Sequence, residues 1–206
     1  MTFTKTLLQK ILDSAVKAVE TNLAYLNELD AATGDGDHGT AILAAVKAAA
    51  ASAHKDGTLA STLETIGWDV MSSTSGSTSA LNGSFFTGMS GSVGGEELDV
   101  SQTAAMFVAG LANVKTATKA QVGDKTLMDA LIPAIAAMSG HANGDSLADV
   151  FRAAAEAAQL GAESTKDLVA KHGRAKNLGE RSRGKLDAGA VSTAIIYKAY
   201  YDAIND

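Results

Sequence analysis

The chain has 206 residues, of which 46% are hydrophobic and only 5% aromatic, and it carries a formal net charge of −6. The negative charge argues against nonspecific nucleic-acid binding as its main role. No cysteine is present, which excludes disulfides and thiolate metal sites within the chain and fits a reducing cytoplasm. No apolar run approaches the roughly 20 residues that cross a membrane, and no signal-peptide pattern opens the chain. We therefore expect a soluble, cytoplasmic protein folded as a single domain over residues 1–206.

Hydrophobic periodicity predicts an all-α protein with no strand. Thr4 is the predicted N-cap of a first helix that continues at helical spacing to about Leu29. The later helices are expected at approximately residues 38–55, 58–70, 85–90, 101–118, 127–142, 146–172 and 190–206. Pro133 falls in the first turns of the sixth, and Asn143-Gly144 ends that helix. Eight helices joined mostly by short loops favour antiparallel neighbours.

Four loops stand out because each follows an odd-numbered predicted helix. They are an acidic loop at 30–40, a hydroxyl-rich run at 73–79, a Gly-Asp-Lys-Thr turn at 123–126 and a basic loop at 173–189. In an up-and-down arrangement, loops after odd-numbered helices emerge at the same end of the molecule. We therefore expect all four loops to gather around one rim.

The acidic loop is the first of these and places three carboxylates beside three glycines. Asp30, Asp35 and Asp37 would repel one another unless a cation lay among them, and an all-oxygen ligand set favours Mg²⁺ or Ca²⁺. The loop also satisfies Gly-x-Gly-x-x-Gly, but it follows a helical pattern and not the strand that a dinucleotide site requires. An EF-hand would need a glutamate where Val46 stands. The alternative is a solvated acidic loop without a metal.

The hydroxyl-rich run and the basic loop could together hold an anion. The run contains four serines and two threonines around Gly76, just before a helix, although a flexible linker is the alternative. The basic loop carries five Lys and Arg side chains, whose guanidinium and ammonium groups can bind phosphate. A solvated basic loop is the alternative. Metal-binding carboxylates, hydroxyls and an arginine are the parts of a phosphoryl-transfer site. Neither a P-loop nor the protein-kinase signature set is present.

Three motifs in order resemble one family over nearly the whole chain: Gly34-Asp35-Gly36-Asp37-His38-Gly39, Gly123-Asp124-Lys125-Thr126, and Gly173-Arg174-Ala175 with Leu178-Gly179-Glu180-Arg181-Ser182. The sequence resembles the nucleotide-binding L subunit of dihydroxyacetone kinases. The resemblance implies an antiparallel up-and-down barrel of eight helices, with the nucleotide site at one end. It also implies two Mg²⁺ ions and bound ADP or ATP.

The resemblance assigns site residues as follows. Asp30, Asp35 and Asp37 would be the Mg²⁺ ligands and would act in catalysis together with Arg174. The residues implied to contact the nucleotide are His38, Gly39, Thr40, Ala41, Gly76, Ser77, Thr78, Thr118, Leu127, Arg174, Asp187, Ala188 and Gly189.

The resemblance also implies partners. The acceptor would be dihydroxyacetone held on a separate sugar-binding K subunit, and the donor would be ATP or an ADP recharged by a phosphocarrier M subunit. Neither nucleic acid nor a membrane is expected. Ala41 stands where the family commonly has Asn, and Ser75–Ala80 and Ala188 also depart from the family pattern. These departures leave open a kinase subunit for a four-carbon ketose, and a non-catalytic nucleotide sensor that binds a transcriptional regulator. The Asp37-His38-Gly39 step and the Arg174 loop argue against the related fatty-acid kinase domain.

Overall fold

The computed structural model describes residues 1–142 and 145–205, and this part of the chain is almost entirely helical. Its α-helices are α1 (Lys5–Thr21), α2 (Leu23–Ala31), α3 (His38–Ala53), α4 (Leu59–Ser73), α5 (Ser77–Ser90), α6 (Val100–Ala117), α7 (Met128–Gly140), α8 (Leu147–Ser164) and α9 (Ala188–Asn205). Two short 3₁₀ segments, η1 (Thr165–Asp167) and η2 (Arg174–Ser182), lie between α8 and α9. The all-α class predicted from periodicity is confirmed.

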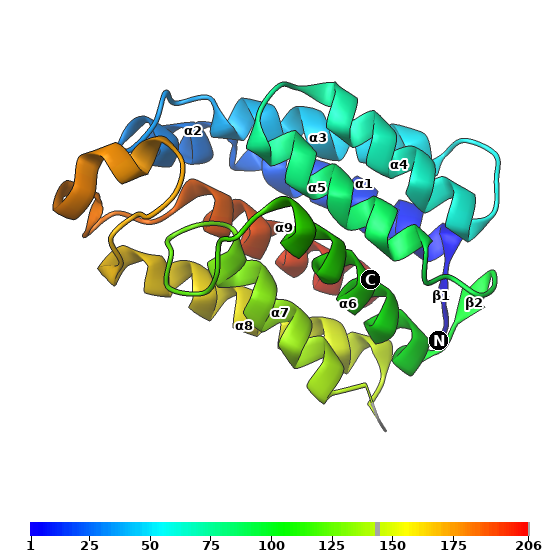
Figure 1. The fold of residues 1–206 in the computed structure, drawn as a ribbon. Helices are drawn as coiled ribbons and strands as arrows, with labels where there is room; N and C mark the ends of the chain where they lie inside the picture. The colour runs from blue at the N-terminus through cyan, green and yellow to red at the C-terminus, as the bar shows by residue number, and fades with distance from the viewer. Residues whose placement is uncertain (143–144, 206) are drawn as a thin grey trace.

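The helices pack as successive neighbours (Figure 1). Helix α1 packs on α3, α3 on α4, and so on in chain order to α8 on α9, while α9 packs back on α1. Apolar side chains fill the space between them, among them the fully buried rings of Phe3, Phe107 and Phe151. Closure of these helices into a barrel stays a prediction.

Small residues explain how the helices approach so closely. A Cβ on Gly67 of α4 would lie 2.9 Å from the carbonyl oxygen of Gly83 on α5, so no larger residue fits there. A Cβ on Gly161 of α8 would overlap the carbonyl oxygen of Asp129 on α7. Pro133 has no N–H to bond to that carbonyl, which is therefore free to face α8. The Ala- and Gly-rich composition thus serves close helix contacts.

One predicted helix is divided into two in the structure, and the predicted start of another was wrong. The first predicted helix breaks at Asn22, whose side-chain amide donates to the carbonyl oxygen of Ala18 (2.8 Å) and so competes with the continuing helix. Helix α5 begins at Ser77, not at Phe85, because Gly76 takes a φ of 115° and the hydroxyl-rich residues after it start the helix. What looked like a linker is therefore partly a helix N-terminus.

One predicted helix end and the absence of strands were also wrong. Helix α8 ends at Ser164 and not near His172, since the hydroxyls of Ser164 and Thr165 fold back onto carbonyls of the last turn (2.8 and 2.6 Å). Two two-residue strands, β1 (Phe3–Thr4) and β2 (Glu97–Leu98), pair antiparallel and are too short to give a periodic signal. The predicted break at Asn143-Gly144 lies outside the described residues.

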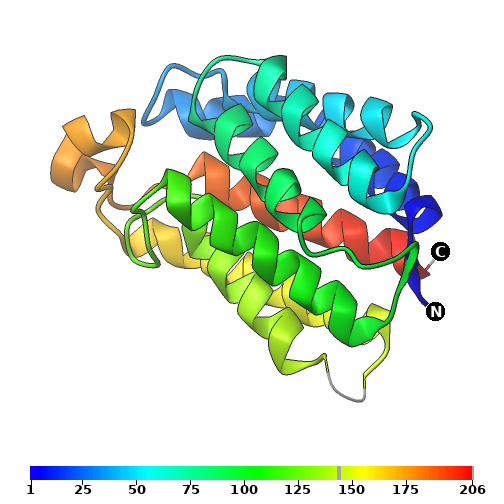
Figure 2. The ribbon, with the colours of Figure 1, turned by 45° about the vertical axis from the view of Figure 1, so that its right-hand side comes forward.

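The predicted rim is confirmed. Figures 1 and 2 place the loops after α2, α4, α6 and α8 at one end of the molecule, opposite the N-terminus. Contacts join three of them: Arg174 forms an ion pair with Asp35, and Lys185 Nζ donates to the carbonyl oxygen of Ala32 (2.6 Å). Lys171 Nζ lies 2.7 Å from Asp124 Oδ1 in the turn before α7. Within the described chain, no helix combines the length and hydropathy that a membrane span requires.

Candidate functional site

The acidic loop brings together the three predicted carboxylates. Asp30 lies in the last turn of α2, and Asp35 and Asp37 come from the loop before α3. Each of the three offers one oxygen, and these oxygens all lie within 4.8 Å of one another. Asp30 is partly buried, while Asp35 and Asp37 are exposed. Three separated positions in the sequence therefore form one cluster at the predicted end of the molecule.

Backbone geometry explains why this loop needs its glycines. Asp30 Oδ2 accepts the N–H groups of Gly36 (2.8 Å) and Asp37 (3.1 Å), which folds the loop back over the end of α2. Gly34 packs so closely on Asp30 Oδ1 that a Cβ would overlap it, and Gly36 has a φ of 81°. Asp30 thus orders the loop through Oδ2 and also belongs to the cluster with Asp35 and Asp37.

The donor set of this cluster fits a hard divalent cation. Three like charges this close destabilise one another, and a bound cation would remove that repulsion. All the ligand atoms are carboxylate oxygens, and the two exposed residues leave room for water and phosphate oxygens, which Mg²⁺ usually retains. The residues present therefore fit the predicted magnesium site.

Arg174 is the cation that the structure places on this cluster. It is the first residue of η2, is exposed, and contacts Asp35 across 139 residues of sequence. Gly173, just before it, has a φ of 61°, which turns the chain so that the guanidinium reaches the acidic loop. An arginine beside the metal ligands is placed where charge on a phosphoryl group would develop.

The start of α3 lies directly behind the carboxylates. His38 Nε2 lies 2.9 Å from Ser192 Oγ on α9. Burial lowers the pKa of His38, although the carboxylates of Asp30 and Asp37 act in the opposite direction. Gly39 is buried against the backbone of Leu23, which leaves no space for a Cβ.

Thr40 and Ala41 complete this turn of α3. The Thr40 N–H donates to Asn27 Oδ1 (3.2 Å), and Asn27 Nδ2 lies 3.3 Å from Thr40 Oγ1. The Ala41 N–H donates to the carbonyl oxygen of Asp37 (2.9 Å), which closes the first helical hydrogen bond. This end of α3 is therefore fixed on α2 by Asn27, a residue that sequence reasoning did not single out.

The hydroxyl-rich run supplies the N-terminus of a second helix at the same end. Gly76 has open space around it, and Ser77 and Thr78 begin α5 with exposed or partly exposed side chains. The N–H groups of a helix's first turn have no partner within the helix, and the helix dipole favours an anion there. The run is placed at the rim (Figure 2), without a direct hydrogen bond to the acidic loop among the described residues.

The N-terminal ends of α7 and α9 approach each other closely and form a surface, the Leu127 wall. Leu127 precedes α7, and a Cβ added to Gly189 would lie 3.3 Å from Leu127 Cβ, so glycine allows this close approach. Ala188 is buried as the first residue of α9. Thr118 caps the end of α6 and accepts the Ala120 N–H (3.1 Å). The structure thus brings Leu127, Ala188 and Gly189 together, with Thr118 in the loop that leads to them.

Asp187 precedes this wall and caps α9. Its Oδ2 accepts the Ala190 N–H (2.8 Å), and its own N–H donates to Thr165 Oγ1 (3.0 Å). Burial raises the pKa of Asp187 to about 6, with the Ala190 N–H opposing the shift and the charge of Asp129 adding to it. A carboxylate that is kept buried, despite the cost of removing its charge from water, often marks a functional position.

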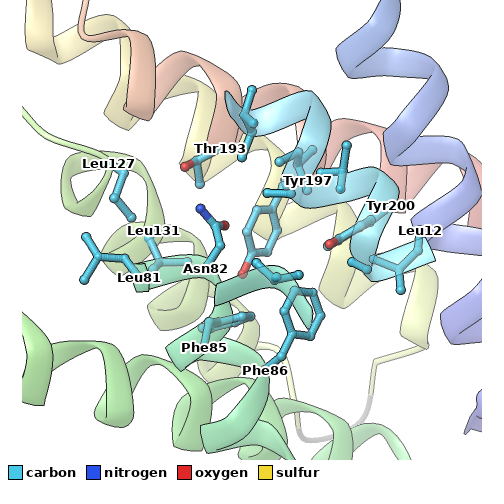
Figure 3. Close-up of a pocket in the computed structure, with 16 residues that line it drawn as sticks. Leu12, Leu81, Asn82, Phe85, Phe86, Leu127, Leu131, Thr193, Tyr197 and Tyr200 are labelled. Atoms are coloured by element: carbon cyan, nitrogen blue, oxygen red, sulfur yellow. The ribbon is translucent and has the colours of Figure 1, made fainter. Parts of the chain in front are cut away.

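A small apolar cavity lies behind Leu127 (Figure 3). Its volume is about 50 Å³, and its walls come from α1, α3, α4, α5, α7 and α9. Leu127 and Leu81 lie at one side of it and Leu12 and Tyr200 at the other. The buried hydroxyl of Tyr197, which also lines it, has no hydrogen-bond partner in the described structure. This volume is well below the roughly 150 Å³ of an apolar cavity that holds a benzene ring, so we do not place the nucleobase there.

Three further side chains hold the rim together; Ser192 and Asp129 were missed from the sequence, and Lys185 was noted there only as one of the cations of the basic loop. Ser192 reaches His38, Asp129 accepts the N–H groups of Gly123 (2.6 Å) and Thr126 (2.7 Å), and Lys185 reaches the acidic loop. Neither Ser192 nor Asp129 belongs to a sequence motif. Ser192 lies in α9 and contacts a residue distant in the sequence, whereas Asp129 lies in α7 and contacts the turn before that helix. Only their positions in the fold identify them.

Comparison with known proteins gives a family for this arrangement. Residues 32–202 match the family model described as the DAK2 domain. A protein of Listeria innocua named "PEP-dependent dihydroxyacetone kinase 1, ADP-binding subunit DhaL" is 34% identical over 202 residues, which cover 97% of this chain and 96% of that protein. The L-erythrulose kinase of Pectobacterium atrosepticum is 36% identical over 202 residues, and this chain spans 34% of its length.

A solved structure agrees with these relatives. The dihydroxyacetone kinase from C. freundii, crystallised with AMP-PNP and Mg²⁺, superposes with a TM-score of 0.75 at 27% sequence identity. The match covers 98% of this chain and 34% of that one. The family model spans most of the chain, and a relative of nearly equal length aligns from end to end. The chain therefore belongs to the DAK2 domain family.

Proposed function

We propose that this chain is the nucleotide-binding subunit of a dihydroxyacetone-type kinase, which transfers a phosphoryl group to a small ketose held on a separate sugar-binding K subunit. The observation that carries the proposal is the Asp30, Asp35 and Asp37 cluster, with Arg174 on it, at the helical rim. ADP-binding relatives of nearly full coverage and a structural neighbour crystallised with a nucleotide analogue and Mg²⁺ support it.

Two Mg²⁺ ions, held by Asp30, Asp35 and Asp37, would neutralise the phosphate chain of ADP or ATP. Asp30 also keeps the loop folded through the Gly36 and Asp37 N–H groups. The imidazole of His38 is oriented by Ser192. These residues position the donor, and positioning with charge neutralisation is the larger part of phosphoryl-transfer catalysis.

Arg174 and the two helix N-termini would act on the phosphoryl group itself. The guanidinium is exposed and could exchange Asp35 for phosphate oxygens, to which it can donate two parallel hydrogen bonds. Ser77 and Thr78 at the start of α5 and Gly39 and Thr40 at the start of α3 would contribute N–H or hydroxyl donors.

The nucleobase would lie against the wall formed by Leu127 and Gly189. Thr118, Asp187 and Ala188 would flank it, and Ala41 would face the phosphates without the polar side chain common in the family. The site opens at the rim, so a partner that carries the acceptor hydroxyl must cover this end. The cytoplasmic location and a role for a phosphocarrier M subunit are parts of the same proposal.

A four-carbon ketose is the second candidate acceptor, because three relatives that match over at least 90% of this chain are named erythrulose kinases. The acceptor is bound by the K subunit, so this chain's own residues favour neither sugar. The third candidate, a nucleotide sensor that binds a transcriptional regulator, rests on the loss of a polar side chain at Ala41.

One reconstitution separates these candidates. The purified chain is mixed with the sugar-binding subunit of a dihydroxyacetone kinase, Mg²⁺ and either ATP or a phosphocarrier system with phosphoenolpyruvate, and sugar phosphate is measured with dihydroxyacetone and with erythrulose. The proposal predicts turnover that is lost in Asp35→Asn and kept in Asp56→Asn, an exposed carboxylate at the far end of the molecule. Nucleotide binding without turnover on either sugar would favour the sensor.

A further inference from the structure

Lys125 has an unusual place in the rim, which the resemblance does not assign. Its side chain is 2% exposed. Among the described residues, Lys125 is the one non-glycine residue with a positive φ (60°). A positive φ is unfavourable for a residue with a Cβ, and burying an ammonium group away from water is unfavourable as well. The turn at 123–126 could have been made more cheaply with glycine or asparagine at this position.

The Lys125 ammonium joins two chain segments, which are also joined by the hydrogen bond from the Asp187 N–H to Thr165 Oγ1 (3.0 Å). Its Nζ donates to the carbonyl oxygens of Thr165, at the end of α8, and Lys185, just before α9. Burial lowers the pKa of Lys125, while the negative charges of Asp187, Asp129 and Asp167 raise it. The buried ammonium is therefore bonded to two carbonyl oxygens, and three carboxylates act on it electrostatically.

These contacts link the two halves of the proposed nucleotide site. On one side, Lys125 is two residues before Leu127, and Asp129 fixes the same turn through Gly123 and Thr126. On the other side, Lys185, whose carbonyl oxygen Lys125 holds, extends its own Nζ to the carbonyl oxygen of Ala32 at the start of the acidic loop. A continuous series of contacts thus runs from the Leu127 wall to the loop that carries the metal ligands.

We propose that Lys125 is a positioning residue, which fixes the distance between the nucleobase wall at Leu127 and Gly189 and the metal loop at Asp30, Asp35 and Asp37. It touches neither base nor phosphate. Because Lys125 fixes this distance, one adenine nucleotide can contact the Leu127 wall and the metal loop simultaneously. The base contacts and the phosphate contacts then each increase the affinity contributed by the other. This inference rests on the proposed function, because it takes an adenine nucleotide with Mg²⁺ as the ligand.

The test compares two ligands that differ in the base. Mg·ADP and Mg·pyrophosphate are titrated by calorimetry into the wild-type chain, Lys125→Met, Lys125→Arg and the control Lys115→Met, an exposed lysine of α6. Lys125→Met should lose about tenfold in affinity for Mg·ADP and keep its affinity for Mg·pyrophosphate within about threefold. Lys125→Arg should recover most of the loss, since it keeps the charge, and Lys115→Met should match the wild type.

A purely structural role would give a different result, because a loss of folded protein lowers the apparent affinity for both ligands equally. Equal losses, or no loss for Mg·ADP, would overturn the inference. If Lys125→Met does not fold, Lys185→Met decides, since it cuts the same series of contacts at Ala32 and should show the same selective loss. A wild-type chain that binds no Mg·ADP would contradict the proposed function, which is a separate outcome.

Discussion

The Asp187 carboxylate should reduce the stability of the protein at neutral pH, and Asp187→Asn should relieve that cost. Burial raises its pKa from 3.8 to about 6, so the native state holds the proton more tightly than the unfolded chain. A shift of about 2 pKa units corresponds to about 3 kcal/mol. Because the residue keeps some exposed surface, we expect about 1–3 kcal/mol. The sign follows from linkage: this penalty is absent below pH 4, grows between pH 4 and 6, and is complete above pH 6.

Asparagine is isosteric, uncharged and an equally good N-cap for α9. Thermal unfolding at pH 8 should therefore show Asp187→Asn melting about 3–10 °C above the wild type, with the difference shrinking at pH 5. Asp99→Asn, the same change at the exposed N-cap of α6, should shift the melting temperature by about 2 °C or less at both pH values. If Asp187 lines the nucleotide pocket, the more stable variant will bind Mg·ADP more weakly. Parallel stability profiles for wild type and Asp187→Asn from pH 5 to 8 would refute the reasoning.

Three further predictions concern the rim. Arg174→Ala should lower kcat in the reconstituted system by about 100-fold or more while nucleotide affinity, measured by calorimetry, changes by about threefold or less; a larger change in affinity than in kcat would place the arginine in binding. Gly39→Ala should lower the melting temperature by about 3–10 °C, because its Cβ would overlap the Leu23 carbonyl, whereas Gly94→Ala, which meets open space, should leave it unchanged. Ser192→Ala should remove the hydrogen bond that orients His38 and slow turnover without preventing Mg²⁺-dependent binding; loss of that binding would contradict the assigned role.

The helical fold could be predicted from the sequence because its signals are local. Apolar spacing found the helices, and glycines or capping residues found most of their ends. Two of the errors fell where a side chain competed with the backbone, as Asn22 does with the Ala18 carbonyl and as Ser164 and Thr165 do at the end of α8. Hydrophobic periodicity depends only on the spacing of apolar residues, so these side-chain hydrogen bonds cannot be predicted from it.

The site was predictable to the extent that it consists of contiguous motifs. Asp35 and Asp37 lie two residues apart, and loop parity correctly placed the Arg174 segment beside them, although 139 residues separate Arg174 from Asp35. Asn27, Ser192 and Lys125 could not be found in this way. Each acts through a partner that only the tertiary structure brings near, and Lys125 was visible as part of a motif while its burial was not.

The central claim is that the carboxylates of the acidic loop bind a nucleotide through divalent metal. Calorimetric titration of ADP into the chain, with Mg²⁺ and then with the metal removed by chelator, tests it directly. The account predicts binding in Mg²⁺ that chelator abolishes, and a loss of about 100-fold or more in Asp35→Asn with none in Asp56→Asn. Equal ADP affinity with and without Mg²⁺, or an unchanged affinity in Asp35→Asn, would contradict it.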